Sequence, residues 1–447
     1  MEVKVIRSEM IKPSNPIPPH LRRHCLSFLD QLEPRILTPF VYFFSHHQVP
    51  HPSPCSSVLK RSLSEALTLF YPLAGRIVGN LYIDCDDEGV RFTETRVSCR
   101  LSDVLVSADD LCPNLERLFP AGISAQEDYV AAVQFNIFEC GGVAIGIGVS
   151  HRVGDASSYF EFIRSWAGIT RSGSLKREDW DSLIPRIVSD EIFPGMSPID
   201  HDPLVVPVET LVTKRFVFSD ESLAAIRGKY GHELRLSRVD ALTEFILQRH
   251  VQVTLKASPN VDHIKYMVSY VINLRPRLSP PLAASAFGNI ITTFHFELPF
   301  TRDGNETSDC KLIPLVRDAV AGANSPEFTT KFRETRLQIE FLKERLDRAQ
   351  GKPRGDMPSV TLNFASLSRF PVYEADFGWG KPEWVGFAGS SRMNHVIFVD
   401  GKEGKSMEAY VALKDEEMKR FQTDPEIVAY TESTSAKATM TGTRPRM

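Results

Sequence analysis

The sequence predicts an α/β fold in two domains, and three observations support this prediction. The chain has 447 residues, more than one ordinary core accommodates. Short apolar runs typical of strands recur between segments whose apolar residues have helical spacing. Residues 184–209 contain five prolines and no apolar periodicity, which is typical of a connection between domains. We therefore expect an N-terminal domain over 1–183, a crossover linker over 184–209 and a C-terminal domain over 210–447.

The first domain begins with a predicted strand at residues 3–6. Residues 41–44 and 130–139 are rich in β-branched and aromatic side chains and predict two further strands. Residues 56–70 have apolar side chains at helical spacing, which predicts a helix ending before Pro72. Residues 143–149 form a short apolar run bounded by polar residues, so a buried strand is expected there.

In the second domain, helices are predicted where a capping residue precedes an apolar pattern. Ser219 is expected to cap a helix over 220–230, and Ser237 with Asp240 a helix through His250. A long amphipathic helix is predicted over 328–349, and a disordered polar tail over 432–447. The predicted strands are residues 213–218, 266–272, 292–298, 359–366, 395–400 and 407–413.

Composition and charge exclude several classes of function. Apolar residues make up 42% and charged residues 24%, as in soluble globular proteins. A net charge of −4 argues against nucleic acid as the main partner. The seven cysteines include no Cys-x-x-Cys pair, so neither a zinc site nor a disulfide framework is expected. With no signal peptide and no apolar run near the ~20 residues of a membrane helix, we expect a cytoplasmic protein without a membrane partner.

The most informative stretch is His151-Arg152-Val153-Gly154-Asp155. It lies between the buried strand and a predicted helix over 156–169, so His151 would stand at a strand end with its ring free to face a cleft. Its ordinary pKa of about 6.5 suits proton transfer near neutral pH. Asp155 is at the expected helix start, where a carboxylate can cap backbone N–H groups. From spacing alone, a structural histidine near a helix cap is an equally good interpretation.

A second stretch, Asp376-Phe377-Gly378-Trp379-Gly380, interleaves glycines with aromatic residues and predicts a tight loop. It has no strand–turn–helix context, so it is not a dinucleotide-binding fingerprint. Ser157 and Ser158 follow Asp155, yet no Gly-x-Ser-x-Gly elbow accompanies them, which weakens a Ser/His/Asp hydrolase.

Together, the two stretches resemble the paired signatures of the plant BAHD acyltransferases. Three further landmarks of that family occur in the same order, so the resemblance covers nearly the whole chain. The opening segment and spacing look most like the vinorine synthase type, a branch that mostly acetylates alkaloids and other specialised metabolites. The landmarks are Phe70-Tyr71-Pro72-Leu73-Ala74-Gly75-Arg76, Asn273-Leu274-Arg275 and Phe287-Gly288-Asn289.

The resemblance implies two chloramphenicol-acetyltransferase-like domains, each a mixed sheet flanked by helices, with a solvent channel between them. It implies that His151 removes the proton of an acceptor hydroxyl, which then attacks the thioester of an acyl-CoA in a ternary complex. Asp155 would orient the site by pairing with an arginine, by position Arg275. Asp376 would support the architecture, also paired with an arginine, rather than take part in the chemistry.

The resemblance also sets the expected substrates. Acyl-CoA, most simply acetyl-CoA, would be the co-substrate, and a hydroxyl of an alkaloid or terpenoid the acceptor, bound by a monomer with no resident cofactor or metal. An N-acyltransferase acting on an amine, or a non-catalytic family member that binds a metabolite, are the alternatives.

The chain departs from the family just before the second stretch. Where many relatives have a Thr-Ser-Trp-like triplet, this chain has Ala365-Ser366-Leu367. Strand alternation predicts that Asn363, Ala365 and Leu367 share one face and that Ser366 lies on the other. We therefore expect a wider pocket on that side.

Overall fold

The fold is described from a computed structural model of the chain. The structure describes residues 1–49, 52–106, 112–120, 129–174, 184–195, 211–230, 235–302, 311–331, 359–389 and 392–431, with residues 334, 337 and 340. The predicted tail over 432–447 lies outside these residues, as does most of the helix predicted over 328–349.

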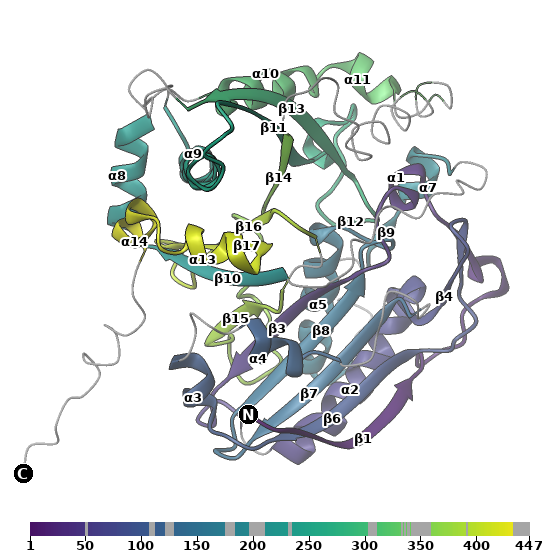
Figure 1. Cartoon of the computed structure of the whole chain (residues 1–447). Helices are drawn as coiled ribbons and strands as arrows, with labels where there is room; N and C mark the ends of the chain where they lie inside the picture. The colour runs from purple at the N-terminus through teal and green to yellow at the C-terminus, as the bar shows by residue number, and fades with distance from the viewer. Residues whose placement is uncertain are drawn as a thin grey trace, which may run out of the picture.

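Two six-stranded mixed sheets form the framework (Figure 1). In the first sheet, β6 and β7 pair in parallel and the other neighbours pair in antiparallel fashion. All eight residues of β8 are buried, because this strand is central and has the continuous apolar sequence of such strands. In spatial order the strands are β1 (Val3–Ile11), β6 (Val90–Val97), β7 (Ala131–Phe138), β8 (Val143–Ser150), β3 (Leu37–Phe44) and β15 (Trp384–Phe387).

Helices α2 (Pro52–Leu69) and α5 (Ala156–Ser172) cover one face of the first sheet (Figure 1). The side chain of Trp166 on α5 is fully buried, and its Nε1–H donates to the carbonyl of Leu59 on α2 at 3.2 Å. Tyr159 donates to the carbonyl of Ile147 on β8 at 3.2 Å. Buried polar groups of this helix pair therefore find partners on the neighbouring elements.

The second sheet is mixed as well, with β14 parallel to both of its neighbours. Its apolar residues form a separate core with α8 (Asp220–Tyr230), α9 (Arg238–Ala257), α10 (Leu312–Gly322), α13 (Asp415–Phe421) and α14 (Pro425–Tyr430). In spatial order the strands are β10 (Leu211–Phe218), β17 (Met407–Lys414), β16 (His395–Asp400), β14 (Ser359–Ser366), β11 (His263–Asn273) and β13 (Ile291–Thr301).

The first sheet is completed by a strand from the far end of the chain. β15 pairs antiparallel with β3, with Trp384 opposite Phe43 and Phe387 opposite Phe40. The rings of Phe43 and Trp384 stack at 5.2 Å between centroids. A strand from the predicted C-terminal domain thus belongs to the sheet of the N-terminal domain. The proposed domain boundary at residues 184–209 therefore stays a prediction.

The remaining elements are short. They include a three-stranded sheet of β2 (Arg23–Cys25), β5 (Tyr82–Asp84) and β4 (Arg76–Val78), and a parallel pair of β9 (Arg186–Ile187) and β12 (Ala286–Phe287). The short helices are η1 (Pro19–Leu21), α1 (Phe28–Gln31), η2 (Tyr71–Ala74), α3 (Leu101–Val106), α4 (Cys112–Arg117), α7 (Ser189–Ile192), η5 (Arg275–Arg277) and α11 (Pro326–Lys331). Within the described ranges, no helix has the length and apolar character to span a bilayer.

Most predicted elements are present, but their lengths differ. The first strand runs to Ile11 instead of residue 6. Residues 7–11 have no alternation of apolar and polar side chains, so the sequence did not indicate that the strand continues. Ser237 and Asp240 form the expected capping box, and Ser219 accepts from the backbone N–H of Ser222. Residues 184–195 of the predicted irregular crossover contain β9 and α7, and residues 196–209 lie outside the described part.

Candidate active site

A cavity opens where the two sheets meet, and His151 is one of its walls. Its empty volume is about 1120 Å³, which includes space open to solvent. Most of the lining is apolar. The lining residues come from β3, the start of α5, β11, β13, β14, β15 and β16, and from the segments next to them. The apolar ones include Ile36, Phe40, Val271, Ile291, Leu367, Phe370, Phe387 and Ile397.

His151 lies at the end of β8, as predicted. Its backbone N–H donates to the carbonyl of Ile36 at 2.8 Å, and its carbonyl accepts from Asn289 Nδ2 at 2.6 Å. The side chain is 22% exposed, and Nδ1 is enclosed. The accessible edge of the ring, which carries Nε2, therefore faces the cavity.

Asp155 and Arg275 form a buried ion pair, as expected from the family resemblance. The two guanidinium nitrogens of Arg275 donate to the two carboxylate oxygens of Asp155 at 2.6 and 3.0 Å. The side chains are 3% and 2% exposed. Asp155 also accepts from the backbone N–H of Ile290 at 3.0 Å. A bidentate pair with extra donors can hold two charges in the interior.

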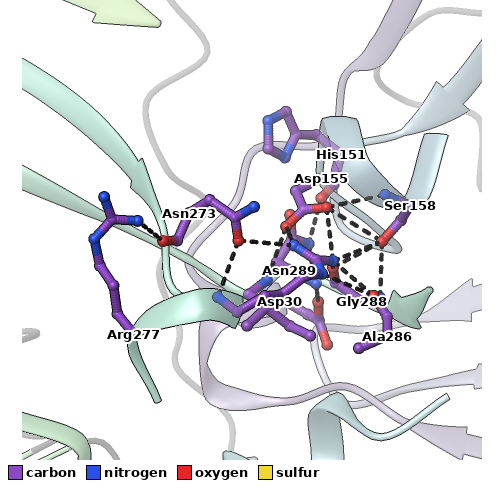
Figure 2. Close-up of polar contacts among 11 residues, drawn as sticks. Asp30, His151, Asp155, Ser158, Asn273, Arg277, Ala286, Gly288 and Asn289 are labelled. Carbon is purple, nitrogen blue, oxygen red and sulfur yellow. Dashed lines mark hydrogen bonds and ion pairs between the residues drawn. The ribbon is translucent and has the colours of Figure 1, made fainter. Parts of the chain in front are cut away.

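The pair links the start of α5 to the segment around η5 (Figure 2). Asp155 caps α5 by accepting from the backbone N–H of Ser158 at 3.1 Å, and Arg275 donates to the carbonyl of Ala286. A side chain at Gly154 would bring its Cβ within 2.6 Å of Ser158 Cβ, so glycine lets the turn close on the helix. Figure 2 shows the His151 ring apart from this network, with no dashed contact reaching it.

Asn289 connects the backbone of His151 to a second buried carboxylate. It donates through Nδ2 and through its backbone N–H to Asp30 Oδ1, at 2.8 and 2.9 Å. The other carboxylate oxygen accepts from Ser27, in the capping box of α1. Burial raises the pKa of Asp30 to about 6, against the opposing effect of the Ser27 and Asn289 donors.

Three ionisable residues of the cavity wall were not predicted from the sequence: Glu33, Arg392 and His395. Glu33 follows α1, and its Oε2 lies 3.5 Å from His151 Nδ1 and 3.0 Å from Arg392 Nη2. His395 begins β16, and burial lowers its pKa to about 3, with further lowering by Arg392 and His151. No local pattern marks these residues, since each is a single polar residue next to an ordinary strand or helix.

The Asp376–Gly380 loop lies outside the cavity, and none of its five residues belongs to the lining. Asp376 Oδ1 accepts from the backbone N–H groups of Gly378 and Gly380, each at 2.9 Å. Both glycines have positive φ, 101° and 97°, which explains their presence. Arg171 lies 3.7 Å from Asp376, so an arginine partner exists but is distant.

The aromatic residues of that loop anchor it to the first domain. Phe377 is 2% exposed and packs edge-to-face on Trp166 at 5.0 Å between centroids. Trp379 packs on Phe44 of β3 at 5.8 Å. The loop therefore ties the segment that leads to β15 onto the first core.

Residues Ala365, Ser366 and Leu367 all belong to the cavity lining. Ser366, predicted on the other face of the strand from Ala365 and Leu367, thus borders the cavity too, and which face its side chain occupies stays a prediction. β14 ends at Ser366, so the alternation of its side chains does not extend past this residue. Leu367 is 8% exposed, and its backbone N–H donates to the carbonyl of Phe398 at 2.8 Å.

The model of the Transferase family matches residues 1–428. Together with the two-sheet fold and the cavity at His151, this match defines an acyl-CoA-dependent acyltransferase. The chain is 34% identical to limonoid 21-O-acetyltransferase of Melia azedarach, over 96% of this chain and 98% of that protein. It is 31% identical to stemmadenine O-acetyltransferase of Catharanthus roseus, over 95% and 97%.

The crystal structure of vinorine synthase has the same fold. Its TM-score is 0.80 at 30% sequence identity, covering 97% of this chain and 99% of that chain. The chain belongs to the Transferase family, that is, to the plant BAHD acyltransferases, and resembles the vinorine synthase branch. The family resemblance and the two-domain fold predicted from the sequence are thus confirmed.

Proposed function

We propose that this enzyme transfers an acetyl group from acetyl-CoA to a hydroxyl of a polycyclic terpenoid or alkaloid, with His151 as the general base. The observation that carries the proposal is the position of His151, at a strand end with its Nε2 edge facing a large, mostly apolar cavity. The relatives named limonoid 21-O-acetyltransferase and stemmadenine O-acetyltransferase support oxygen as the acceptor atom.

In the proposed reaction, Nε2 of His151 takes the proton of the acceptor hydroxyl as the oxygen attacks the thioester carbon. A tetrahedral intermediate forms, then the C–S bond breaks and the CoA thiolate takes the proton from the imidazolium. No acyl-enzyme is required. Asp155, paired with Arg275, orients the turn that carries His151 and does not exchange protons with substrate. Asp376 supports the loop behind the cavity.

Two further parts of the proposal concern the setting. We propose a cytoplasmic enzyme, since Cys25, Cys85, Cys99 and Cys140 carry free thiols, as is usual in a reducing compartment. We propose a monomer, as the family resemblance implies.

The test is an assay with acetyl-CoA and matched panels of limonoid alcohols, alkaloid alcohols and amines, followed by thiol release and product mass. Transfer to alcohols is expected, and His151→Ala should lower turnover by about 10² to 10⁴-fold, the usual contribution of a positioned base. His263→Ala, at the exposed start of β11, is the matched control. Unchanged turnover in His151→Ala would overturn the base assignment, and transfer to amines alone would establish an N-acyltransferase.

A further inference from the structure

A carboxylate lies beside the inner nitrogen of His151. Nδ1 is enclosed and makes no hydrogen bond to any described residue, while Glu33 Oε2 is 3.5 Å away. The Glu33 side chain is 5% exposed. An N–H on Nδ1 would therefore have a buried carboxylate within 3.5 Å, and such contacts often tighten once substrate is bound.

Glu33 is held in place through its backbone and its side chain. Its N–H donates to the carbonyl of Asp30 at 3.1 Å, and its carbonyl accepts from Arg152 Nε at 3.0 Å. Arg152 is 1% exposed, so this anchor is interior. On the side chain, Arg392 Nη2 donates to Oε2 at 3.0 Å. The carboxylate thus has a fixed position between Arg392 and the ring of His151.

We propose that Glu33 is a positioning residue for the base, and this inference rests on the proposed function of His151. The Glu33 carboxylate accepts the Nδ1–H of His151, which fixes the tautomer whose unprotonated Nε2 faces the cavity. When Nε2 takes the hydroxyl proton, the same carboxylate stabilises the imidazolium, and Nδ1–H stays on the ring. Arg392 limits this effect by sharing the negative charge of Glu33.

Of the three carboxylates described near His151, Glu33 is the one that lies beside Nδ1, because Asp155 and Asp30 interact with other groups. The negative charge of Asp155 is matched by Arg275. Asp30 accepts from Asn289, and it is Asn289 that donates to the carbonyl of His151. His395, across the cavity, is neutral near pH 7, since its pKa is about 3. Among the residues that the structure describes, the titratable and charged groups around the ring are Glu33, Arg392, His395, Arg152, Asp155 with Arg275, and Asp30.

The first measurement is the pH profile of kcat/KM for Glu33→Gln, which keeps the shape and removes the charge. Loss of the carboxylate disfavours the imidazolium, so the acidic limb should move about one unit to lower pH. We expect kcat to fall about 10- to 100-fold, with KM for acetyl-CoA changed less than twofold. If Glu33 served folding alone, Glu33→Gln would lower the amount of active enzyme but would not shift the acidic limb of the pH profile.

The second measurement uses Arg392→Gln, for which the proposal requires the opposite sign. Removing this cation leaves the Glu33 charge more available to His151, so the acidic limb should move to higher pH. Glu374→Gln is the matched control, since Glu374 is 52% exposed, pairs with Lys381 and does not line the cavity. The acidic limb of the kcat/KM pH profile of Glu374→Gln should coincide with that of the unaltered enzyme.

Opposite shifts in the first two variants support the positioning role. An unmoved limb in both variants, or a shift of the same sign, would overturn it. Such a result leaves the proposed function intact as long as His151→Ala remains inactive, so the two failures are distinguishable. If Glu33→Gln does not fold, Glu33→Asp takes its place, because its shorter side chain withdraws the carboxylate from Nδ1 and should also move the acidic limb to lower pH.

Discussion

The cavity wall at His151 and the loop at Asp376 each contain one aspartate of a family motif. The two carboxylates differ in burial and in the groups that neutralise their charge. Asp155 is 3% exposed and has a bidentate arginine with a contact of 2.6 Å. Asp376 is 25% exposed, its arginine is 3.7 Å away and 59% exposed, and its closest donors are backbone N–H groups of its own loop. The first aspartate links distant segments across the cavity wall, whereas the second closes a local turn.

This difference shows that belonging to a motif does not by itself determine how much an aspartate contributes to the stability of the fold. A charge removed from water depends on its partner, whereas a partly exposed charge is screened and its distant partner contributes little. We therefore expect the aspartates to respond unequally to the same substitution, although both belong to the signatures of one family.

The largest expected effect is that of Asp155→Ala. The change leaves the Arg275 guanidinium buried without its carboxylate and removes the cap of α5, so the free energy of unfolding should fall by about 3–5 kcal/mol. Denaturant unfolding monitored by tryptophan fluorescence would measure this loss. Arg275→Ala should be similarly costly, because it leaves the carboxylate unpaired.

Asp376→Ala is the matched comparison within the second motif. It removes two hydrogen bonds to a partly exposed carboxylate, and a loss of about 1.5 kcal/mol is expected. Turnover should fall only as far as the folded fraction does. Equal losses in Asp155→Ala and Asp376→Ala would remove the distinction, and loss of turnover at full stability in the second variant would indicate a chemical role for Asp376.

The next effect is smaller and depends on pH. His395 has a pKa of about 3 in the folded state, below 6.5 in the unfolded chain. Above pH 6.5 both states are neutral. As pH falls toward 3, the unfolded chain binds a proton that the folded state does not, so stability is lost.

At pH 5, this difference amounts to at most about 2 kcal/mol, because the ring keeps some contact with solvent in the cavity. His395→Gln should remove the dependence, so its stability relative to the unaltered protein should improve between pH 7.5 and pH 5. Paired denaturant titrations at the two pH values measure the change. A stability difference that does not vary with pH would show that His395 titrates normally.

The local parts of this site could be predicted from the sequence, and the long-range parts could not. An apolar run, a histidine and a helix cap are adjacent in sequence, so His151 and Asp155 were predicted with their elements. Glu33, Arg392 and His395 meet only because two sheets converge. β15 has four residues, too few for a recognisable period, so its exchange into the first sheet had no signal.

The smallest expected effect is that of substitutions at Leu367, which lies between the cavity wall at His151 and the loop at Asp376. It lines the cavity and also belongs to the core cluster that contains Phe377 of the second motif. The family resemblance implies a tryptophan at this position in many relatives, which would fill part of the cavity and add one N–H donor. Leucine offers less volume and no donor, and its neighbours Ala365 and Ser366 are also small.

If volume is what matters, Leu367→Trp should reduce kcat/KM about tenfold with a longer acyl-CoA or a bulky acceptor and little with acetyl-CoA and a small alcohol, since one or a few carbon atoms in an apolar pocket are worth about 1–3 kcal/mol. Leu367→Phe is the matched control, because it adds volume without a donor and should reproduce the selective loss. If instead the missing donor limits turnover, Leu367→Trp should raise kcat with every substrate and Leu367→Phe should not. The two variants together therefore separate pocket size from oxyanion stabilisation. Their melting temperatures show whether the added ring disturbs the shared core, where overpacking costs about 1–3 kcal/mol.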